Sequence, residues 1–311
     1  MKLYAGIDGG QSSTVAVVGD ESGKILGKGD CGPCDHVDEP LDSSRLHDAL
    51  NGALERAAEN ANLDADVQYC AIVAGISGLS DGTPSPTVSL PAREVRLMHD
   101  APIAWEGAFG GEAGIVVIAG TGSVAYGRQS DGRAVTVGGW GYLFGDEGSA
   151  FAIARRALSI AMRDSDAGRH STLRSVALEF FGRPSLRAIA HNFYVRAITR
   201  SQLARFAEPV ADAAARGDAA AQNIVAEAMH ALALLASEAC EALQCVPNPA
   251  VAFTGGLMQR SELRRSAQER LNSVLPGARS VPPRFEPAVG ALLLAYLAGG
   301  ESAALQRALG H

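Results

Sequence analysis

The chain has 311 residues, which is long for a single hydrophobic core, so two domains are expected. Hydrophobic residues make up 47% and charged residues 20%, as in an ordinary soluble globular protein, and 27 basic against 34 acidic side chains give a net charge of −7. The acidic balance, the few aromatic residues and the lack of a basic run argue against a nucleic-acid partner.

Neither end of the chain has a segment that we expect to enter a membrane. The stretch MKLYAGIDGG leads directly into a strand, unlike a signal peptide, and the apolar run PAVGALLLAYLAGG is shorter than the about 20 residues that cross a bilayer. The cysteines form an odd set without framework spacing: Cys31, Cys34, Cys70, Cys240 and Cys245. These features predict a protein of the reducing cytoplasm.

Two similar groups of three strands are predicted, one at the start and one in the middle of the chain. The first has strands over 2–7, 14–18 and 24–27, joined by the turns DGGQSS and GDESG. The second has strands in GIVVIAG, VAYGR and RAVTVGG, joined by GTGS and QSDG. The repeated order indicates an internal duplication, although such meanders also arise by chance.

Helices and further strands alternate with these groups. Apolar strands are predicted in QYCAIVAGISG, REVRLMHD and AVAFT, and the alternation favours an α/β protein with layered sheets. We expect one domain over residues 1–114, completed by a C-terminal helix in 286–311, and a second domain over 115–285. Helical periodicity covers 43–60, 101–109, 150–163 and most of 171–245.

Three glycine-rich turns each follow an apolar strand: DGGQSS from Asp8, GTGS from Gly120 and TGG from Thr254. Glycine lets backbone N–H groups approach phosphate oxygens, and neighbouring hydroxyl groups can add donors. None of the turns matches a Walker A loop or GxGxxG, and any one alone is equally typical of a hairpin. Asp8 makes the combination more specific, because Mg²⁺ explains a carboxylate beside a phosphate site.

The segments GIDGGQSST, AGTGSVAYG, GGWGYLFGDEGSAFAIAR and FTGGL resemble the motifs of the N-acetylglucosamine kinase branch of the actin/hexokinase/Hsp70 superfamily, a branch of BadF/BadG/BcrA/BcrD type. The resemblance covers essentially the whole chain, and GGWGYLFGDEGSA is its most specific segment. It implies two ribonuclease H-like (actin-like ATPase) domains, ATP bound in an interdomain cleft, and a homodimer.

The resemblance also implies roles for individual residues. Asp8 would hold Mg²⁺ through water. The residues implied at the phosphates of ATP are Gly9, Gly10, Ser12, Gly120, Thr121 and Gly122, and those implied at the adenosine are Gly255 and Gly256. The residues implied at the sugar are Asp35, His36, Asp100, Ser123, Gly139, Trp140, Gly141 and Asp146.

Asp100, at the end of REVRLMHD, corresponds to the catalytic base of the family. Phosphoryl transfer to an alcohol needs an aligned hydroxyl whose proton is accepted, and a carboxylate at the C-terminal edge of a strand suits that role. The structural alternative is that Asp100 caps a helix that begins at Ala101, with Pro102 in its first turn. The two roles are compatible.

The GDEGSA segment has similar alternatives. Asp146 and Glu147 precede a predicted helix and could serve as its cap. The glycines crowded into 138–148 favour instead a backbone wrapped closely around a ligand, which agrees with the sugar contacts of the family. Trp140 has a second interpretation, as a buried core residue.

The segment CGPC, residues 31–34, has the sequence of a thioredoxin redox centre. It follows a strand and leads into DHVDEP, whose carboxylates oppose thiolate formation, so a redox role is disfavoured. Zinc could bind Cys31, Cys34 and His36, but no second C-x-x-C or H-x-x-H pair completes the site, so a zinc site is disfavoured as well. We expect a loop that forms a wall of the sugar pocket, with Asp35 accepting bonds from hydroxyls and Asp35–His36 at the place of the family's Asn–His pair.

Two departures from the family pattern concern the substrate. Asp35 stands where the family has an asparagine, and Val124 stands where N-acetylglucosamine kinases have a second asparagine. An added negative charge and a lost amide donor suit a free amine, so glucosamine joins N-acetylglucosamine as an expected substrate. The prediction is an ATP- and Mg²⁺-dependent kinase that phosphorylates a hydroxyl of an amino sugar.

Two other functions fit the same fold. One is an ATPase that activates a 2-hydroxyacyl-CoA dehydratase or benzoyl-CoA reductase. Such activators carry an iron–sulfur cluster that bridges two subunits through cysteines, and the close pair Cys31 and Cys34 lies in the wrong loop for it. The other is a sugar-sensing module without catalysis, against which the presence of both Asp8 and Asp100 argues.

Overall fold

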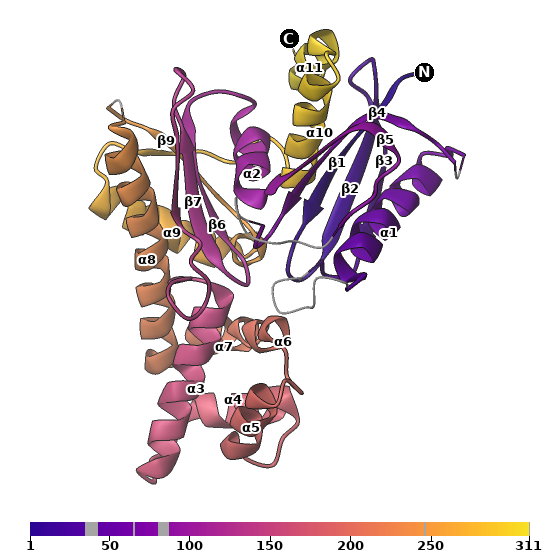
Figure 1. Ribbon diagram of the computed structural model, residues 1–311. Coiled ribbons are helices and arrows are strands. Elements are labelled where there is room, and N and C mark those ends of the chain that lie inside the picture. The colour runs from indigo at the N-terminus through magenta and orange to yellow at the C-terminus, as the bar shows by residue number, and fades with distance from the viewer. Residues whose placement is uncertain (35–42, 65, 80–86, 246, 311) are drawn as a thin grey trace. The chain divides into compact units, whose positions relative to one another are not determined.

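The protein is described by a computed structural model that covers residues 1–34, 43–64, 66–79, 87–245 and 247–310. The chain divides into two compact units (Figure 1). The first comprises Met1–Gly114 and Pro282–His311, and the second comprises Ile115–Val281. The C-terminal segment therefore completes the unit that the N-terminal segment begins.

The first unit is built on a five-stranded sheet with the order β3-β2-β1-β4-β5. The first three strands form an antiparallel meander, and β4 and β5 continue parallel to β1. The strands are β1 (Leu3–Gly9), β2 (Thr14–Asp20), β3 (Ile25–Cys31), β4 (Tyr69–Ile76) and β5 (Ala92–His99). The helices are α1 (Arg45–Asn60), α2 (Asp100–Phe109), α10 (Pro287–Ala298) and α11 (Ser302–Leu309).

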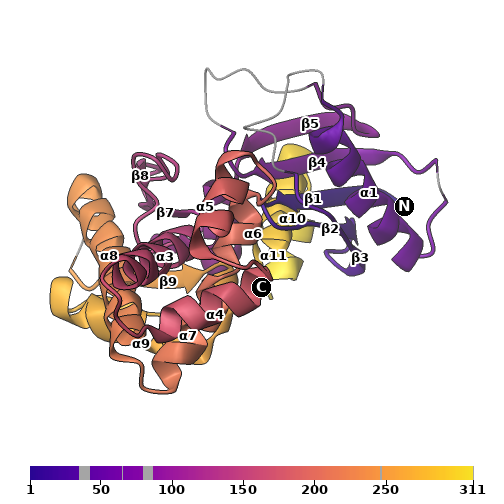
Figure 2. The same cartoon turned by 90° about the horizontal axis from the view of Figure 1, so that it is seen from below.

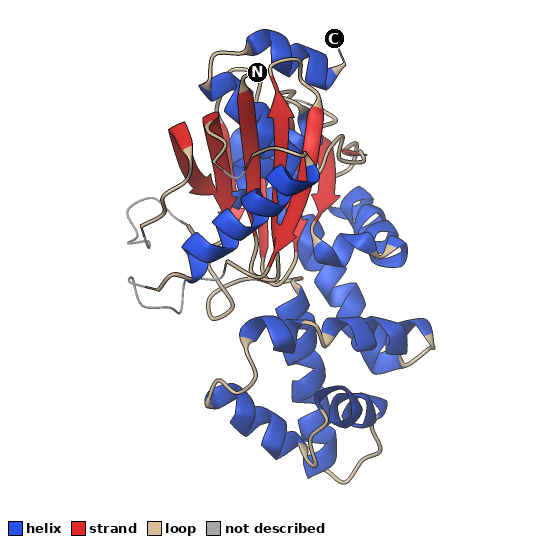
Figure 3. Ribbon diagram, turned by 90° about the vertical axis from the view of Figure 1, so that its right-hand side faces the viewer, coloured by secondary structure: helices blue, strands red, loops and turns tan. Residues whose placement is uncertain are grey.

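Helices cover both faces of this sheet (Figure 3). On one face, Leu50 of α1 packs in a buried cluster with Ile7 of β1. On the other, Tyr4 of β1 packs in a second cluster with Leu292 and Tyr296 of α10. Because β1 is buried on both sides, its sequence is a continuous apolar run and does not alternate with polar residues.

Glycine allows α10 to approach the sheet at backbone distance. A Cβ on Gly6 of β1 would lie 2.1 Å from the backbone nitrogen of Leu292 and 2.4 Å from the carbonyl oxygen of Ala288. A Cβ on Gly290 of α10 would lie 2.0 Å from the carbonyl oxygen of Ile103 in α2. Backbone contacts therefore fix α10 against β1 and α2 at the same time.

The second unit has a five-stranded sheet with the order β10-β9-β6-β7-β8. Its strands are β6 (Gly114–Ala119), β7 (Ser123–Arg128), β8 (Ala134–Gly138), β9 (Ala250–Thr254) and β10 (Arg279–Ser280). Its helices are α3 (Ala150–Asp166), α4 (Thr172–Phe181), α5 (Leu186–Tyr194), α6 (Arg200–Ala204), α7 (Ala207–Ala215), α8 (Ala219–Leu243), the 3₁₀ helix η1 (Gly256–Gln259) and α9 (Ser261–Val274).

The two sheets share one topology, with β6 in the place of β1. In both sheets, two further strands lie on the open side of the meander's first strand. Both of them run parallel to that strand. The repeated strand arrangement predicted from the turns is thereby confirmed, as is the predicted α/β class. The sequence missed β10, which has only two residues, and the predicted terminal helix is interrupted between α10 and α11.

Helix α8 packs against α3, α7 and α9 and against the strands β7 and β8 (Figure 2). By length and composition alone this helix could cross a membrane. Ile224, Met229 and Leu232 on α8 are nevertheless buried in the core of the unit. That burial is typical of the core helix of a globular domain.

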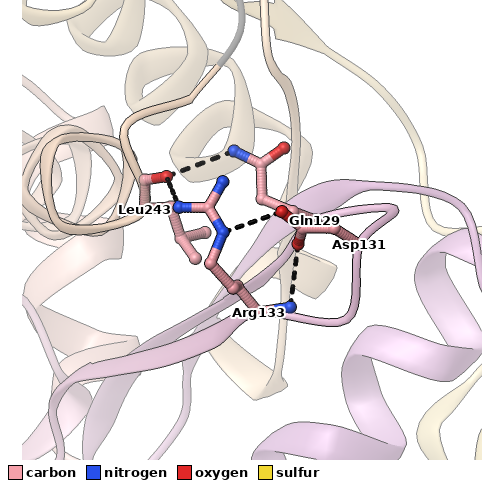
Figure 4. Close-up of polar contacts among 4 residues, drawn as sticks. All are labelled: Gln129, Asp131, Arg133 and Leu243. Carbon is pink, nitrogen blue, oxygen red and sulfur yellow. Dashed lines mark hydrogen bonds and ion pairs between the residues drawn. The ribbon is translucent and has the colours of Figure 1, made fainter.

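The turn between β7 and β8 binds the C-terminal end of α8 (Figure 4). Gln129 Nε2 and Arg133 Nη1 each donate to the carbonyl oxygen of Leu243 at 3.3 Å. Asp131 accepts from the backbone nitrogen and Nε of Arg133 at 3.0 and 2.8 Å. The last carbonyls of a helix lack intrahelical donors and form the negative end of its dipole, so these donors stabilise the helix end.

The Gly6 contact makes a prediction about stability. We expect Gly6→Ala to destabilise the protein by about 1–3 kcal/mol or more, because its methyl group meets backbone atoms that cannot rotate away. Gly32→Ala is the matched control, since no heavy atom lies within 4 Å of its Cβ position. Thermal unfolding of the two variants measures the difference, and equal melting temperatures would contradict the packing argument.

Candidate active site

The first glycine turn joins β1 to β2 and is braced by the CGPC loop. The Gly10 N–H donates to the carbonyl oxygen of Ser13 at 2.9 Å and closes the turn. The Cys34 N–H donates to the Gly10 carbonyl oxygen at 3.1 Å, and Thr14 Oγ1 donates to that of Gly32 at 2.8 Å. These hydrogen bonds hold the backbone of the glycine turn against the CGPC loop.

Cys34 has a packing role beneath this turn. Its side chain is fully buried in the cluster that contains Leu50, and a Cβ on Gly9 would lie 2.9 Å from its Sγ. All five cysteines are free thiols, and the described residues hold no group of three or more His, Cys, Asp or Glu that could ligate a metal by themselves. The predicted sugar contacts Asp35 and His36 lie outside the described residues.

Two other carboxylates of the first unit act on Asp8. Asp8 ends β1 next to the glycine turn, Asp100 is the first residue of α2, and Glu286 precedes α10. Burial, together with the smaller effects of the Asp100 and Glu286 charges, raises the pKa of Asp8 to about 7. The ionised form of Asp8 is therefore disfavoured near neutral pH unless a cation is bound.

The donor set fits Mg²⁺ bound through water. Asp8 supplies the carboxylate, and Gln11 Oε1 is a buried oxygen without a hydrogen-bond partner in the described part of the chain. Asp100 Oδ1 is buried as well, with His99 Nδ1 at 2.9 Å. Such a small set of protein ligands suits Mg²⁺, which keeps several waters and takes further oxygens from phosphate. A cation here would also offset the repulsion between Asp8 and Asp100.

Asp100 does not cap its helix. The N-cap of α2 is His99, whose Nδ1 accepts a hydrogen bond from the Ala101 N–H at 3.1 Å. Asp100 is already in the helix, so its carboxylate cannot reach back to the first free N–H groups. The capping alternative is wrong, and the Asp100 carboxylate is left at the C-terminal edge of β5.

The second glycine turn joins β6 to β7 and meets the start of α3. The Gly120 N–H donates to the carbonyl oxygen of Gly122 at 2.9 Å, which closes a turn one residue shorter than the first. The Ala150 N–H, at the start of α3, donates to the carbonyl oxygen of Gly120 at 2.9 Å. The turn therefore lies next to the N-terminus of a 17-residue helix, whose dipole favours anions.

The TGG segment lies against the same turn. β9 pairs with β6 up to Thr254 and Ile118, and Gly255 has a φ of 98°. A Cβ on Gly255 would lie 2.5 Å from the carbonyl oxygen of Ala119, whereas nothing lies within 4 Å of a Cβ on Gly256. The structure thus brings Gly255 and Gly256 beside the second predicted phosphate turn.

Asp146 links the GDEGS segment to the second turn. Its Oδ1 accepts from the Ser123 N–H at 3.1 Å, and its Oδ2 accepts from Arg200 Nη2 at 2.6 Å. Burial raises the pKa of Asp146, although the Ser123 hydrogen bond and the Arg200 charge act in the opposite direction. Ser149 caps α3 by accepting from the Ala152 N–H at 3.1 Å, so the capping alternative for Asp146 is wrong.

Arg200 is a residue that the sequence analysis missed. It lies 54 positions from Asp146 and begins α6 after the capping residue Thr199. Its guanidinium is 5.0 Å from the ring centre of Tyr142 and 5.9 Å from that of Phe151. No local pattern marks such a distant partner, since only the fold brings the two charges together.

Trp140 lies in an exposed loop, and the core alternative is wrong. Its side chain is 77% exposed, and the neighbouring Phe144 is 84% exposed. The Gly139 N–H donates to the carbonyl oxygen of Ser123 at 3.1 Å, while Ser123 Oγ donates to that of Glu147 at 2.7 Å. The loop backbone is therefore fixed to β7 while its aromatic side chains extend into solvent.

A comparison with known families matches residues 5–295 of the chain to the BadF/BadG/BcrA/BcrD ATPase family. The chain belongs to this family. The resemblance inferred from the glycine turns and the GGWG segment is thereby confirmed.

Individual relatives within the family are named as sugar kinases. An N-acetylmuramic acid/N-acetylglucosamine kinase of Clostridium acetobutylicum is 28% identical over 95% of this chain and 98% of its own length. An N-acetyl-D-glucosamine kinase of Dictyostelium discoideum is 24% identical over 94% of this chain and 98% of its own. The crystal structure of a candidate N-acetylglucosamine kinase from Chromobacterium violaceum superposes with a TM-score of 0.77 and 28% identity, covering 95% and 99% of the two chains.

The raised pKa of Asp8 predicts how stability depends on pH. An acid whose pKa is higher in the folded state takes up protons on folding, so its contribution to stability falls as pH rises from about 4 to about 7. We expect Asp8→Asn to be more stable than wild type at pH 8 without divalent ions, by on the order of 1–2 kcal/mol, and to lose this advantage near pH 4.

Melting temperatures in chelator at pH 4, 6 and 8 measure this effect. Millimolar Mg²⁺ at pH 8 should then raise the melting temperature of wild type more than that of Asp8→Asn, since the carboxylate would hold the ion. A pH-independent difference between the two proteins would contradict the assignment of the titration to Asp8.

The Asp146–Arg200 pair makes a second prediction. The two side chains are 5% and 14% exposed, so Arg200→Met leaves a buried carboxylate without its cation and should cost about 3 kcal/mol. The control is Arg169→Met, because Arg169 pairs with Asp164 while 61% exposed and such pairs contribute about 0–1 kcal/mol. Chemical unfolding measures both losses, and equal losses would show that the buried pair contributes little.

Proposed function

We propose that the protein is a kinase that transfers the γ-phosphoryl group of ATP to a hydroxyl of an amino sugar, N-acetylglucosamine or glucosamine. The observation that carries the proposal is the position of the Asp100 carboxylate, directly after the C-terminal end of β5 and with its Oδ1 2.9 Å from Nδ1 of His99. Near-full-length similarity to kinases of N-acetylglucosamine supports the choice of substrate class.

The Asp100 carboxylate would act as the general base. It accepts the proton of the sugar hydroxyl while the hydroxyl oxygen forms a bond to the γ-phosphorus and the bond from that phosphorus to the ADP oxygen breaks. Because such a transition state is loose, alignment of the hydroxyl contributes more than strong proton removal. The position of Asp100 at a helix start, fixed by the His99 cap, suits this alignment.

Both glycine turns would bind phosphate oxygens. In the first, Gly9, Gly10 and Ser12 supply backbone and hydroxyl donors, and in the second Gly120, Thr121 and Gly122 do so. Mg²⁺ held through water by Asp8 would neutralise charge on the phosphates. The adenosine would lie at Gly255 and Gly256, next to the second turn.

The sugar would be bound by the residues that the resemblance implies. The proposed contacts are Asp35, His36, Asp100, Ser123, Gly139, Trp140, Gly141 and Asp146. Trp140 is exposed and so can stack on an apolar sugar face, whereas both oxygens of Asp146 are already engaged by Ser123 and Arg200. Asp146 would therefore act mainly by fixing the loop that carries Trp140.

The activator alternative has less support. Cys34 is fully buried under the first glycine turn, so it cannot share a cluster with a second subunit. The two relatives, both named as kinases, align with this chain over nearly their whole length. We further propose a cytoplasmic homodimer, which size-exclusion chromatography with light scattering would test.

Replacement of the base gives the direct test. Asp100→Asn should lower kcat for sugar-dependent ADP release by roughly 10²–10⁴-fold, because the amide cannot accept the hydroxyl proton. Its melting temperature and its affinity for sugar should stay close to wild type. Asp64→Asn, a change of the same kind at an exposed position of the same unit, should leave kcat unchanged.

A panel of N-acetylglucosamine, glucosamine, N-acetylmuramic acid and plain hexoses, assayed by ADP release, identifies the substrate. Sugar-dependent turnover by iron-free, colourless protein would also separate the kinase from an iron–sulfur activator and from a sensor. Absence of turnover with every sugar, or full activity of Asp100→Asn, would contradict the proposal.

A further inference from the structure

Helix α8 ends in a Schellman motif that contains two cysteines. Gln244, directly after the helix, has a φ of 50°, in the left-handed region. Its N–H donates to the carbonyl oxygen of Glu241 at 2.9 Å, and the Cys245 N–H donates to that of Cys240 at 3.0 Å. These two bonds define the motif, and Cys240 and Cys245 occupy the two positions whose side chains commonly pack against each other in it.

The backbone of the motif brings the two cysteines within reach of a disulfide. Because the 3.0 Å bond connects the Cys245 nitrogen to the Cys240 carbonyl, standard bond lengths limit the separation of the two Cα atoms to less than about 7 Å. A disulfide joins Cα atoms about 4.4–6.8 Å apart. The two side chains also meet, since a hydrogen bond joins their thiols. The free thiols therefore already have the arrangement that a disulfide needs.

The pair is accessible and stands apart from the other cysteines. Neither Cys240 nor Cys245 is fully buried, and both pack along the core of the second unit. The other three cysteines of the sequence belong to the first unit. Among the described residues, no third His, Cys, Asp or Glu joins the pair to form a metal site. Of the reactions typical of paired thiols, disulfide formation is thus favoured over metal binding.

The surroundings distinguish the two sulfurs. Burial, and then the hydrogen bond and the charge of Cys240, raise the pKa of the Cys245 thiol. Cys245 therefore keeps its proton and donates it to the sulfur of Cys240. Because the thiolate is the reactive form of cysteine, oxidation should begin at Cys240.

We propose that Cys240 and Cys245 form a redox site that a peroxide oxidises reversibly to a disulfide. Cys240 is the sulfur that reacts first, and Cys245 is the thiol that resolves the product. A disulfide that forms only transiently in a reducing compartment is typical of redox sensing. The inference does not depend on the kinase activity proposed above.

The reaction balances with hydrogen peroxide as the oxidant. The Cys240 thiolate forms a bond to one peroxide oxygen, the O–O bond breaks, and the second oxygen leaves as hydroxide, so that Cys240 becomes a sulfenic acid. The Cys245 sulfur then forms the S–S bond while the S–O bond breaks, and the Cys245 proton leaves with the hydroxyl group as water. Two thiols thereby lose two electrons and two protons, and the peroxide is reduced to two waters. A dithiol reductant reverses the step by thiol–disulfide exchange.

The disulfide would enclose the point at which the β7–β8 turn is bound (Figure 4). Leu243 lies between the two cysteines, and its carbonyl oxygen accepts from Gln129 and Arg133. A cross-link from Cys240 to Cys245 would fix the backbone of this last turn. Oxidation should therefore stabilise the contact between α8 and the β7–β8 turn.

Mass spectrometry after oxidation tests the pair directly. Reduced protein is treated with an equal molar amount of hydrogen peroxide, and the remaining thiols are alkylated with iodoacetamide. Both cysteines lie in one tryptic peptide, residues 217–260. This peptide should lose both alkylation sites together with two hydrogens, and it should regain both sites when dithiothreitol is added before alkylation. Two thiols that are still alkylated, or a disulfide that forms only between molecules, overturn the proposal.

Single variants test the order of the reaction. In Cys245→Ser the reaction should stop at the sulfenic acid of Cys240, which dimedone labels. In Cys240→Ser, the thiol of Cys245 should be oxidised about tenfold more slowly than Cys240 is in wild type, and an equal rate overturns the assignment of the two sulfurs. Cys31→Ser, at a partly exposed cysteine of the first unit, is the matched control and should form the disulfide as wild type does. Alanine variants at 240 and 245 repeat the test should serine lower the stability.

Thermal unfolding distinguishes a redox site from two cysteines that merely fill an apolar contact. Oxidised wild type should melt about 2–5 °C above the reduced protein, because the cross-link restricts the unfolded chain without distorting the folded one. The double variant Cys240→Ala/Cys245→Ala should show no such shift after peroxide. A lower melting temperature of the oxidised protein would show that the fold must distort to close the bond, and this result overturns the proposal.

Discussion

The approach of α10 to β1 and α2 at backbone distance is the constraint on which the first unit depends. Gly6 and Gly290 remove the side chains that would separate these elements. Because α10 begins after Glu286, the same contact brings that carboxylate toward Asp8, and it also fixes the helix whose first residue is Asp100. Glu286, which lies near the C-terminus of the chain, therefore helps to raise the pKa of Asp8 near the end of β1.

Each unit has a glycine turn after the first strand of its meander, but different residues hold the two turns in place. The first is braced by the Cys34 loop and the apolar core beneath it, and the charges of Asp100 and Glu286 act on its carboxylate Asp8. The second is held by Asp146, which has Arg200 as a cation. One meander fold has therefore been adapted to two tasks by the residues that surround its turn.

The sequence predicted what local patterns determine and missed what the fold brings together. The meanders, their repetition and the family follow from turn residues and apolar runs near one another in the chain. The cap of α2 could not be assigned, because His99 and Asp100 are both plausible caps until the backbone shows which is helical. Arg200 was missed because its partner lies 54 residues away, and the exposure of Trp140 contradicts the usual behaviour of its residue type.

The surroundings of Asp146 and Asp8 indicate different roles for these two carboxylates. A buried carboxylate costs stability unless hydrogen bonds and a cation offset the loss of water. The protein supplies these for Asp146, which makes its loop rigid without needing a ligand. For Asp8, burial and then the charges of Asp100 and Glu286 raise the pKa to about 7. Such an arrangement lowers the stability of the free protein, and a bound cation would supply the compensating charge. This difference agrees with the proposed catalytic roles of Asp8 and Asp100 and with the proposed loop support by Asp146.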